Sequence, residues 1–249
     1  MSTEGLPWPE GYHLVLLDEV DSTMAEAARR APDIQGPTWI MARRQTAARG
    51  RRGRAWEQAP GNLAATLVYK PWATPREAAK RSFMAANALY ESLAMFTDRT
   101  HLALKWPNDV LLNGGKVAGI LLESAARGPV LDWLAVGFGV NLASAPARVA
   151  GDFRPVSLWS EAGQTVDPRE FLAILAGHFA TQEAKLDALG FPRIREDWLR
   201  HAARIGEEIT ARTTQGEVRG VFDTVDLDGN LILITATGPQ IIPAADVYF

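Results

Sequence analysis

The stretch LALKWPNDVLLNGGKVAGILLES, residues 102–124, sets the class of fold. Two short apolar runs, 102–105 and 110–112, precede an Asn-Gly-Gly turn at 113–115, and a third apolar run follows at 116–124. Asn-Gly between apolar runs is a strong hairpin signal, because both residues tolerate the positive φ angles that a tight turn needs. The stretch therefore predicts neighbouring strands of one sheet.

Strand-like and helix-like segments flank this stretch on both sides. Strands are expected at 13–17, 38–42, 63–69 and 132–142, and helices at 24–30, 75–96, 168–189 and 192–203. Ser22 or Thr23 can cap the first helix, with Glu26 as the partner in a capping box. We therefore predict an α+β fold with a central mixed β-sheet flanked by helices.

The pattern changes near residue 204. Beyond it, short alternating runs separated by Gln-Gly and Asp-Gly turns replace the helix-like segments. Such a change from a helical to an alternating period marks a boundary between domains. We predict a larger domain at 1–203 and a small β-barrel-like domain at 204–249.

The composition excludes several classes of protein. Its 26 Lys and Arg against 29 Asp and Glu give a formal net charge of −3, which argues against a general nucleic-acid or membrane-surface protein. Without cysteine, the chain can have no disulfide, thiolate zinc site or cysteine nucleophile. The N-terminus lacks the regions of a signal peptide, and no run approaches the ~18 apolar residues of a membrane span. We therefore expect a soluble, cytoplasmic protein with no membrane partner.

The most unusual feature is RRQTAARGRRGR, residues 43–54, with six arginines in twelve positions. A run of charge is most often a solvated face, and a nucleic-acid patch is the next alternative. However, Gly50 and Gly53 keep this backbone mobile, and arginines supply forked donors for carboxylate or phosphate. The segment suits a loop that closes over a polyanionic ligand, whose charge offsets the repulsion among the arginines.

Two further motifs place polar residues or glycines in or beside predicted strands. The first motif is KWPND at 105–109, followed by Lys116. An Asn-Asp pair beside a turn and a lysine at a strand end are commonly structural. Yet Asp109 could hold Mg²⁺ through water, and Lys116 could neutralise a phosphoryl group. Gly119 in mid-strand indicates close approach by a ligand or another backbone. The stretch GFGVN, 137–141, adds two strand glycines before an Asn, without the following helix that a dinucleotide fingerprint needs.

Together, four motifs resemble those of the biotin–protein ligase family. They are DST at 21–23, RQTAARGRRGRAW at 44–56, KWPNDVLLNGGKVAGILLE at 105–123 and GFGVN at 137–141, and their order and spacing match the family. The C-terminal stretch, with Gly220, Asp228-Gly229 and Asp246-Val247, resembles the family's small SH3-like domain, so the resemblance covers residues 12–249.

The resemblance implies an activity and an organisation. It implies an enzyme that uses ATP and Mg²⁺ to activate biotin as biotinyl-5'-AMP and then attaches it to a lysine of a biotin carboxyl carrier protein or domain. Residues 1–203 would be the catalytic domain and 204–249 an SH3-like β-barrel. No covalent protein intermediate is needed, because arginines, a lysine and Mg²⁺ position and neutralise the anionic reactants.

The resemblance also implies a role for each matching residue. The catalytic positions are Lys116, Arg51 and Asp109, with Lys116 between the biotin carboxylate and the α-phosphate and Asp109 associated with the metal. The positions expected at biotin are Ser22, Thr23, Gln45, Arg49, Arg51, Lys116 and Gly119. The positions expected at ATP or the adenylate are Arg49, Arg51, Arg52, Arg54, Trp56, Lys105, Asn108, Lys116 and Asn141.

The chain departs from the family's pattern in three places. Ala48 stands where the loop usually begins with Gly, and a positive φ there would cost on the order of 1 kcal/mol. No aromatic clearly matches one that covers adenine in some relatives, although Val156 and Trp159 fall near that place. About twenty residues precede Ser22, too few for the helix-turn-helix domain of relatives that repress transcription. We therefore expect a monofunctional ligase, monomeric or homodimeric, that does not bind DNA.

Three alternatives stand beside this function. The nearest is a lipoate–protein ligase, which shares the fold and the adenylate chemistry. Biotin is favoured because the hydroxyls of Ser22 and Thr23 can donate to its ureido carbonyl and the Gln45 amide can accept from its N–H. An RNA-binding protein would interleave aromatics with the arginines, where only Trp56 follows them. A biotin-binding regulator without ligase activity would not need the catalytic lysine and aspartate. The related octanoyl transferases need a cysteine, which the chain lacks.

Overall fold

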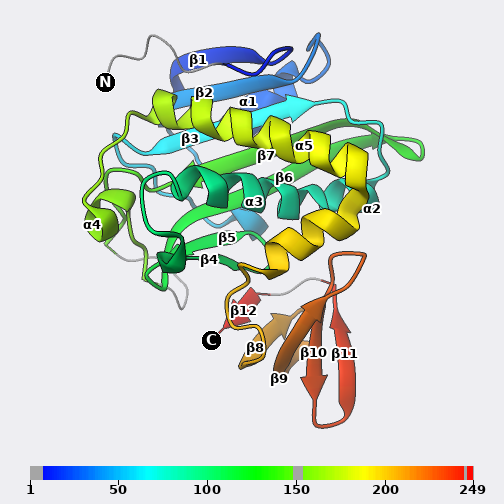
Figure 1. Ribbon diagram of the computed structural model, residues 1–249. Helices are drawn as coiled ribbons and strands as arrows, with labels where there is room; N and C mark the ends of the chain where they lie inside the picture. The colour runs from blue at the N-terminus through cyan, green and yellow to red at the C-terminus, as the bar shows by residue number, and fades with distance from the viewer. Residues whose placement is uncertain (1–7, 148–153, 244–245, 249) are drawn as a thin grey trace.

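The computed structural model describes residues 8–147, 154–243 and 246–248, and the chain forms two β-sheets in them (Figure 1). The larger sheet has seven strands in the order β1-β2-β3-β7-β6-β5-β4. They are β1 (His13–Val20), β2 (Thr38–Gln45), β3 (Leu63–Tyr69), β4 (Leu102–Lys105), β5 (Asp109–Leu112), β6 (Gly115–Arg127) and β7 (Val130–Val140). Since β1 and β2 pair in parallel and the other neighbours pair antiparallel, the sheet is mixed, as predicted.

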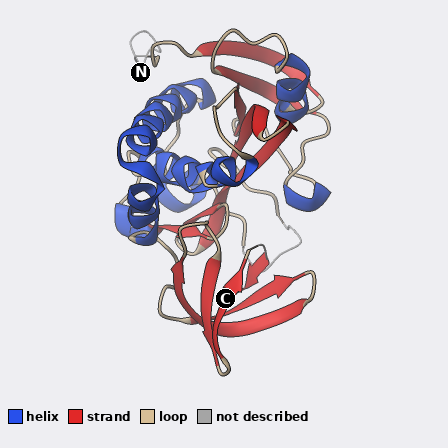
Figure 2. Ribbon diagram, turned by 90° about the vertical axis from the view of Figure 1, so that its right-hand side faces the viewer, coloured by secondary structure: helices blue, strands red, loops and turns tan. Residues whose placement is uncertain are grey.

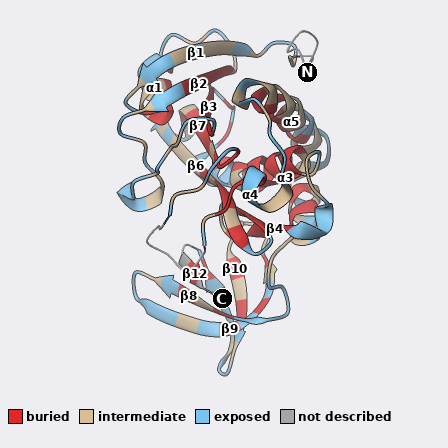
Figure 3. Ribbon diagram, turned by 90° about the vertical axis from the view of Figure 1, so that its left-hand side faces the viewer, coloured by how far each residue is buried: buried red, intermediate tan, exposed pale blue. Residues whose placement is uncertain are grey.

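Helices cover both faces of this sheet. In Figure 1, α3 (Arg81–Leu93) and α5 (Pro168–Leu199) lie side by side on the near face, and α1 (Thr23–Arg30) lies on the far one, as the turned view of Figure 2 also shows. Successive side chains of a strand point to opposite faces, so Trp39 packs edge-on against Phe179 of α5 whereas Ile40 packs in the cluster beneath α1. Figure 3 shows the buried residues gathered between the sheet and these helices. The predicted α+β architecture is confirmed.

The predicted hairpin is confirmed, with longer strands. β5 pairs antiparallel with β4 and with β6, and the turn residues Asn113 and Gly114 have φ angles of 49° and 75°. β6 continues to Arg127 and forms a second hairpin with β7, which begins at Val130. These long strands carry glycines of the sequence motifs into the middle of the sheet.

The helices differ in detail from the expectation. The helix expected at 75–96 is divided at Lys80 into α2 (Pro75–Ala79) and α3. The two helices expected at 168–189 and 192–203 follow one another directly within α5, which is kinked between them at Gly190, where φ is 72°. The short helix α4 (Leu158–Ala162) was not expected, because its Ser157 cap pairs with another serine three residues on rather than with a glutamate.

The smaller sheet has five antiparallel strands in the order β11-β10-β9-β8-β12. They are β8 (Glu208–Thr213), β9 (Gly216–Val225), β10 (Leu231–Thr235), β11 (Gly238–Ile242) and β12 (Asp246–Tyr248). In the described part of the chain β11 and β12 do not pair with each other, so strand pairing leaves this sheet open. Its β9–β10 turn touches the larger unit, where Trp106 Nε1 donates to Gly229 O at 3.1 Å. None of the helices described is long and apolar enough to cross a bilayer.

Candidate active site

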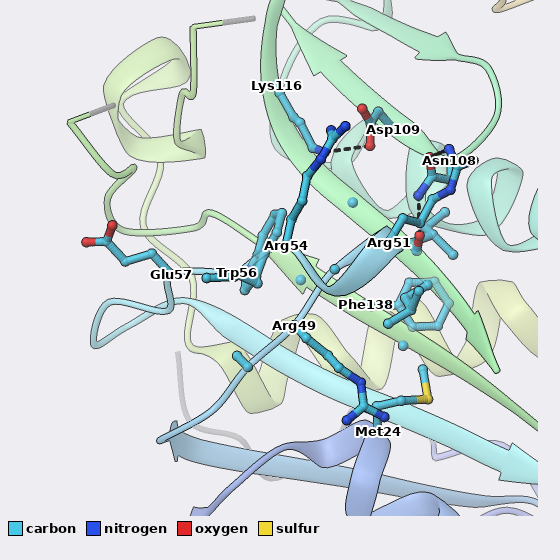
Figure 4. Close-up of a pocket in the computed structure, with 18 of the residues that line it drawn as sticks. Met24, Arg49, Arg51, Arg54, Trp56, Glu57, Asn108, Asp109, Lys116 and Phe138 are labelled. Carbon is cyan, nitrogen blue, oxygen red and sulfur yellow. Dashed lines mark hydrogen bonds and ion pairs between the residues drawn. The ribbon is translucent and has the colours of Figure 1, made fainter. Parts of the chain in front are cut away.

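A cavity of about 780 Å³ lies where α1, the arginine-rich loop and strands β5, β6 and β7 meet (Figure 4). It brings together the predicted site residues except Arg52, which is exposed and does not line it. The predicted residues that line the cavity are Ser22, Thr23, Gln45, Arg49, Arg51, Arg54, Trp56, Lys105, Asn108, Asp109, Lys116, Gly119 and Asn141. Segments more than a hundred positions apart in the sequence therefore converge on one space.

The end of the cavity next to Met24 holds a cluster of uncharged hydrogen-bonding side chains, and the Arg49 guanidinium also points toward this end (Figure 4). The backbone N–H and the hydroxyl of Thr23 both donate to Gln45 Oε1, at 2.8 and 3.1 Å, and Thr66 donates to Thr23 Oγ1 at 2.9 Å. These two bonds occupy both lone pairs of Gln45 Oε1. Gln45 can therefore donate to a ligand but has no acceptor left, contrary to the expectation from the sequence.

Neither Ser22 nor Thr23 caps α1 through its side chain. Ser22 is the N-cap residue, yet it makes no side-chain capping bond, and its own N–H donates to Asp21 Oδ1 at 2.7 Å. Glu26, the expected partner in a capping box, accepts from Arg29 and Arg30 instead. Ser22 is therefore the N-cap residue as predicted, but the predicted side-chain cap and capping box are absent, and both Ser22 and Thr23 line the cavity.

Two glycines on neighbouring strands form a flat floor under Trp56. Gly119 on β6 and Gly139 on β7 lie opposite one another in the sheet. A Cβ atom at Gly119 would lie 3.2 Å from Trp56 Cζ3, and one at Gly139 only 2.5 Å from Trp56 Cε2. The indole thus packs on bare backbone, which accounts for the mid-strand glycines of the sequence.

Lys116 and Asp109 form an ion pair beside this floor. Lys116 Nζ lies 2.7 Å from Asp109 Oδ1, and the two side chains are 29% and 15% exposed. The same Nζ lies 5.6 Å from the centre of the Trp56 ring, within range of a cation–π interaction. Figure 4 shows the pair at the opposite end of the cavity from Met24. Because Arg51 and Arg54 lie near the same end (Figure 4), this end is cationic, whereas the end next to Met24 holds the uncharged hydrogen-bonding cluster.

The arginine-rich loop is a short hairpin closed on itself. Gly50 N–H donates to Arg54 O at 2.7 Å, and Trp56 N–H donates to Ala48 O at 3.0 Å. The positive φ angles of this loop fall at Arg52 and Gly53, the tip of the hairpin. Ala48 is not among the residues with positive φ, so the backbone cost considered for it does not arise.

Two arginines of the loop are held by partners within the protein. Arg49 donates to both carboxylate oxygens of Glu123, at 3.1 and 2.8 Å, and this hydrogen bonding raises the pKa of its guanidinium. Arg51 Nη1 donates to Asn108 Oδ1 at 3.2 Å. Figure 4 shows Arg49 pointing away from Lys116. An anion at the cationic end would therefore compete with Glu123 for Arg49.

A buried acceptor lies close to Lys116. Asn141 follows β7 and is 3% exposed, and its Nδ2 donates to Val156 O at 3.0 Å. Its Oδ1 is buried with no hydrogen-bond partner among the described residues. Leaving such an atom unpaired costs about 1–3 kcal/mol, and the amino group of a ligand would satisfy it. Val156 and Trp159 do not line the cavity.

Two family models match the chain. One, described as the biotin/lipoate A/B protein ligase family, matches residues 16–141, and the other, described as the biotin protein ligase C terminal domain, matches residues 205–249. Over 238 residues the sequence is 52% identical to the biotin–[acetyl-CoA-carboxylase] ligase of Paracoccus denitrificans, with 94% of this chain and 99% of that protein covered. The chain belongs to the biotin protein ligase family.

Other members of the biotin protein ligase family agree in sequence and in fold. The bifunctional ligase/repressor BirA of Bacillus subtilis is 30% identical, with 95% of this chain and 74% of that protein covered. The solved biotin protein ligase from Aquifex aeolicus in complex with biotin and ATP has a TM-score of 0.78 at 25% identity, covering 95% of this chain and 97% of that one.

Several cavity residues lie outside the four motifs that resemble those of the biotin protein ligase family. Met24 directly follows the first motif, and Thr66 lies in β3, whose sequence LAATLVY reads as an apolar strand. Nothing local marks a threonine in such a strand as part of a site. Its hydrogen-bond partner, Thr23, is 43 positions away in the sequence, and the two hydroxyls meet only when α1 packs on the sheet.

Proposed function

We propose that the protein uses ATP to convert biotin into biotinyl-5'-AMP and then transfers the biotinyl group to a lysine of a biotin carboxyl carrier protein or domain. The observation that carries this proposal is the asymmetry of the cavity, which has a cluster of uncharged hydrogen-bonding groups next to Met24 and a cationic end at Lys116, Arg51 and Arg54 (Figure 4). Biotin has the same asymmetry, with an uncharged ureido ring at one end and a carboxylate at the other. The cavity volume of about 780 Å³ is within the usual range for small-molecule sites.

The proposed chemistry follows from charge. A carboxylate oxygen of biotin attacks the α-phosphorus of ATP, a mixed anhydride forms and pyrophosphate leaves. Both reactants are anions, so Lys116, Arg51 and Arg54 bind and orient them and stabilise the charge that builds up in the transition state. Asp109 holds the Lys116 ammonium in place at 2.7 Å. In the second step the amine of the acceptor lysine attacks the acyl carbonyl and AMP leaves.

The adenosine of ATP has complementary groups near Lys116. The unpaired Oδ1 of Asn141 is suited to accept from the exocyclic amine of adenine. Trp56 offers an aromatic face, and Lys105 and Asn108 line the same cavity. Closure of the 46–56 loop over the adenylate would shield the hydrolysable anhydride from water.

Magnesium would bind to the protein together with ATP. Among the residues described, no three His, Asp or Glu side chains converge in a way that could hold a metal ion. Mg²⁺ suits this arrangement, because it keeps several waters and commonly binds one or two carboxylates plus the phosphates of its substrate. Asp109 is the carboxylate that would hold it through water, and the ion would neutralise phosphate charge. We also place the enzyme in the cytoplasm, where ATP is available.

The hydrogen-bonding cluster next to Met24 favours biotin over lipoate. Among the described groups it leaves the Ser22 hydroxyl, one N–H of Gln45 and one lone pair of Thr23 Oγ1 for a ligand. A ureido ring pairs with donors and acceptors alike, whereas the dithiolane of lipoate pairs with neither. Sites that hydrogen-bond a substrate reject analogues without the matching group by about 10⁴–10⁵ in favourable cases. Lipoate should therefore be used at least ~10³-fold less efficiently than biotin.

Biotin-dependent exchange of pyrophosphate into ATP tests the proposal with the purified protein. We expect exchange with biotin, little with lipoate, and a greater loss of biotin use than of lipoate use in Thr23→Val. Transfer to a purified biotin carboxyl carrier domain tests the second step. Comparable kcat/KM for the two acids would overturn the biotin assignment in favour of a lipoate ligase.

A further inference from the structure

A hydrogen-bond chain runs through the polar side chains at the Met24 end of the cavity. From Thr66 it passes to Thr23 Oγ1 at 2.9 Å and from Thr23 to Gln45 Oε1 at 3.1 Å. From Gln45 Nε2 it passes to Gln58 Oε1 at 3.2 Å, and Gln58 Nε2 donates to Ala42 O at 3.3 Å. Thr66 and Gln58, near its two ends, lie outside all the motifs that mark the site in the sequence.

The direction of this chain is fixed by backbone groups. The Thr23 N–H can only donate, so the atom that it meets at 2.8 Å must be the oxygen of the Gln45 amide. The Ala42 carbonyl can only accept, so Gln58 must present its nitrogen there and its oxygen to Gln45. The Thr23 hydroxyl gives its single proton to Gln45, and Thr66 must therefore donate to Thr23.

The fixed direction determines what the ligand meets. Gln45 has both lone pairs of its oxygen occupied and one proton of its nitrogen given to Gln58, so it offers one N–H. Thr23 has given its proton and accepted from Thr66, so its oxygen offers one lone pair. A donor and an acceptor side by side complement a cyclic urea, in which a carbonyl adjoins an N–H.

We propose that Thr66 and Gln58 are positioning residues that fix the donor and acceptor roles of Gln45 and Thr23 and thereby make the cavity selective for a cyclic urea. This inference rests on the proposed function, in which the ligand is biotin. Thr66 lines the cavity but is 0% exposed on β3, and its hydroxyl donates to Thr23, through which we infer that it acts. Gln58 does not line the cavity and acts through Gln45.

Thr66→Val tests the Thr66 end of the chain. A net neutral hydrogen bond contributes about 1 kcal/mol, so KM for biotin should rise about five- to tenfold. The value of kcat and the KM for ATP should stay within about twofold, since Lys116 lies at the other end of the cavity. Thr66→Ser keeps the donor and should restore the KM for biotin. Thr38→Val is the matched control, because Thr38 is also a buried strand threonine, whose hydroxyl donates to Gly36 O at 2.9 Å away from this cavity.

A double-mutant cycle separates positioning from direct contact. If Thr66 acts through Thr23 rather than by touching the ligand, Thr66→Val should cost less than about twofold in KM for biotin when Thr23 is already Val. Gln58→Met should likewise raise KM for biotin, whereas Gln35→Met, which removes an exposed glutamine that bonds the Asp33 carbonyl, should not.

Three results would overturn the inference. They are an unchanged KM for biotin in Thr66→Val, an equal rise in Thr38→Val, and full additivity with Thr23→Val. Wild-type exchange with biotin, measured in the same series, shows whether the proposed function holds. Failure of that function is thus distinguishable from failure of this inference.

Discussion

Trp56 lies directly on Gly139, so that a Cβ atom at position 139 would come within 2.5 Å of Trp56 Cε2 and 2.7 Å of Cζ2 and Nε1. Gly139 is a mid-strand residue of β7, held by pairing with Ala64 of β3 and Gly119 of β6. Because the backbone on both sides is fixed in the sheet, any side chain at 139 must displace the indole. The second glycine of the GFGVN motif, Gly139, is therefore required for the packing of Trp56 in the site.

The Gly139→Ala substitution should displace Trp56 and disturb the floor of the cavity. A displacement of about 1 Å near reacting groups can cost on the order of 10² in rate, so we expect at least ~10-fold slower biotin-dependent exchange. Gly177→Ala is the control, since Gly177 lies in α5 with nothing within 4 Å of a Cβ there, and alanine favours the helix. Exchange rates and tryptophan fluorescence measure the effect. If Gly139→Ala kept the wild-type exchange rate and the wild-type tryptophan fluorescence, the contact between Trp56 and position 139 would be contradicted.

Lys116→Ala should block adenylation while leaving most of the binding of biotin. Its charge is needed where phosphate charge develops, so kcat for exchange should fall about 10²–10³-fold, with the Kd for biotin changed only a few-fold. Lys185→Ala is a matched control, because Lys185 pairs with Asp197 at 2.8 Å with nearly the same exposure, away from the cavity. Exchange kinetics and calorimetric titration with biotin check this. A near wild-type kcat would remove Lys116 from the reaction.

Trypsin cleavage within residues 46–56 should slow when biotin and MgATP are present. Arg52 is exposed at the tip of the hairpin, where a protease can reach it, and an adenylate would draw the other loop arginines onto its charges. Mass spectrometry of the fragments over time gives the rate at each arginine. Biotin alone and MgATP alone serve as controls, and identical cleavage in all four states would rule out closure of the loop.

The ion pair of Asp21 and Arg29 should make a small, pH-dependent contribution to stability. Hydrogen bonds from Arg29 lower the pKa of Asp21 from 3.8 to about 2. A carboxyl with a lowered folded-state pKa stabilises the fold above its unfolded pKa, and this stabilisation is lost as the pH falls from about 4 to 2. The carboxylate is 47% exposed and screened by solvent, so Asp21→Asn should cost less than about 1 kcal/mol at pH 7.

Urea unfolding of wild type and Asp21→Asn at pH 7 and pH 2.5 measures this difference. The two proteins should differ at pH 7 and converge at pH 2.5. Asp18→Asn is the control, because Asp18 faces Arg43 at 3.7 Å with both side chains almost fully exposed. A difference between wild type and Asp21→Asn that persists at pH 2.5 would show that it does not come from the charge.

Much of the fold followed from signals contained within a few residues. Asn113 and Gly114 tolerate the positive φ of a tight turn, and Gly190 with Pro192 interrupts a helical pattern wherever it occurs. The extension of β6 to Arg127 could not be foreseen, because its end is set by pairing with the strand β7. The helix α4, by contrast, was not expected although it has local signals, a cap formed by Ser157 with Ser160 and an end at Gly163, whose φ is 65°.

For the site, the sequence by itself determined which residues gather, because the four motifs mark α1, the loop and the ends of the central strands, and the family resemblance places them together. Only the tertiary structure decided which of these residues line the cavity and which hydrogen bonds and ion pairs each of them can still offer to a ligand. It left Arg52 outside the cavity, paired Arg49 with Glu123, and used up the acceptor of Gln45. Hydrogen-bond direction depends on partners 22 and 43 positions apart, as at Thr23, and such pairings exist only after the chain has folded.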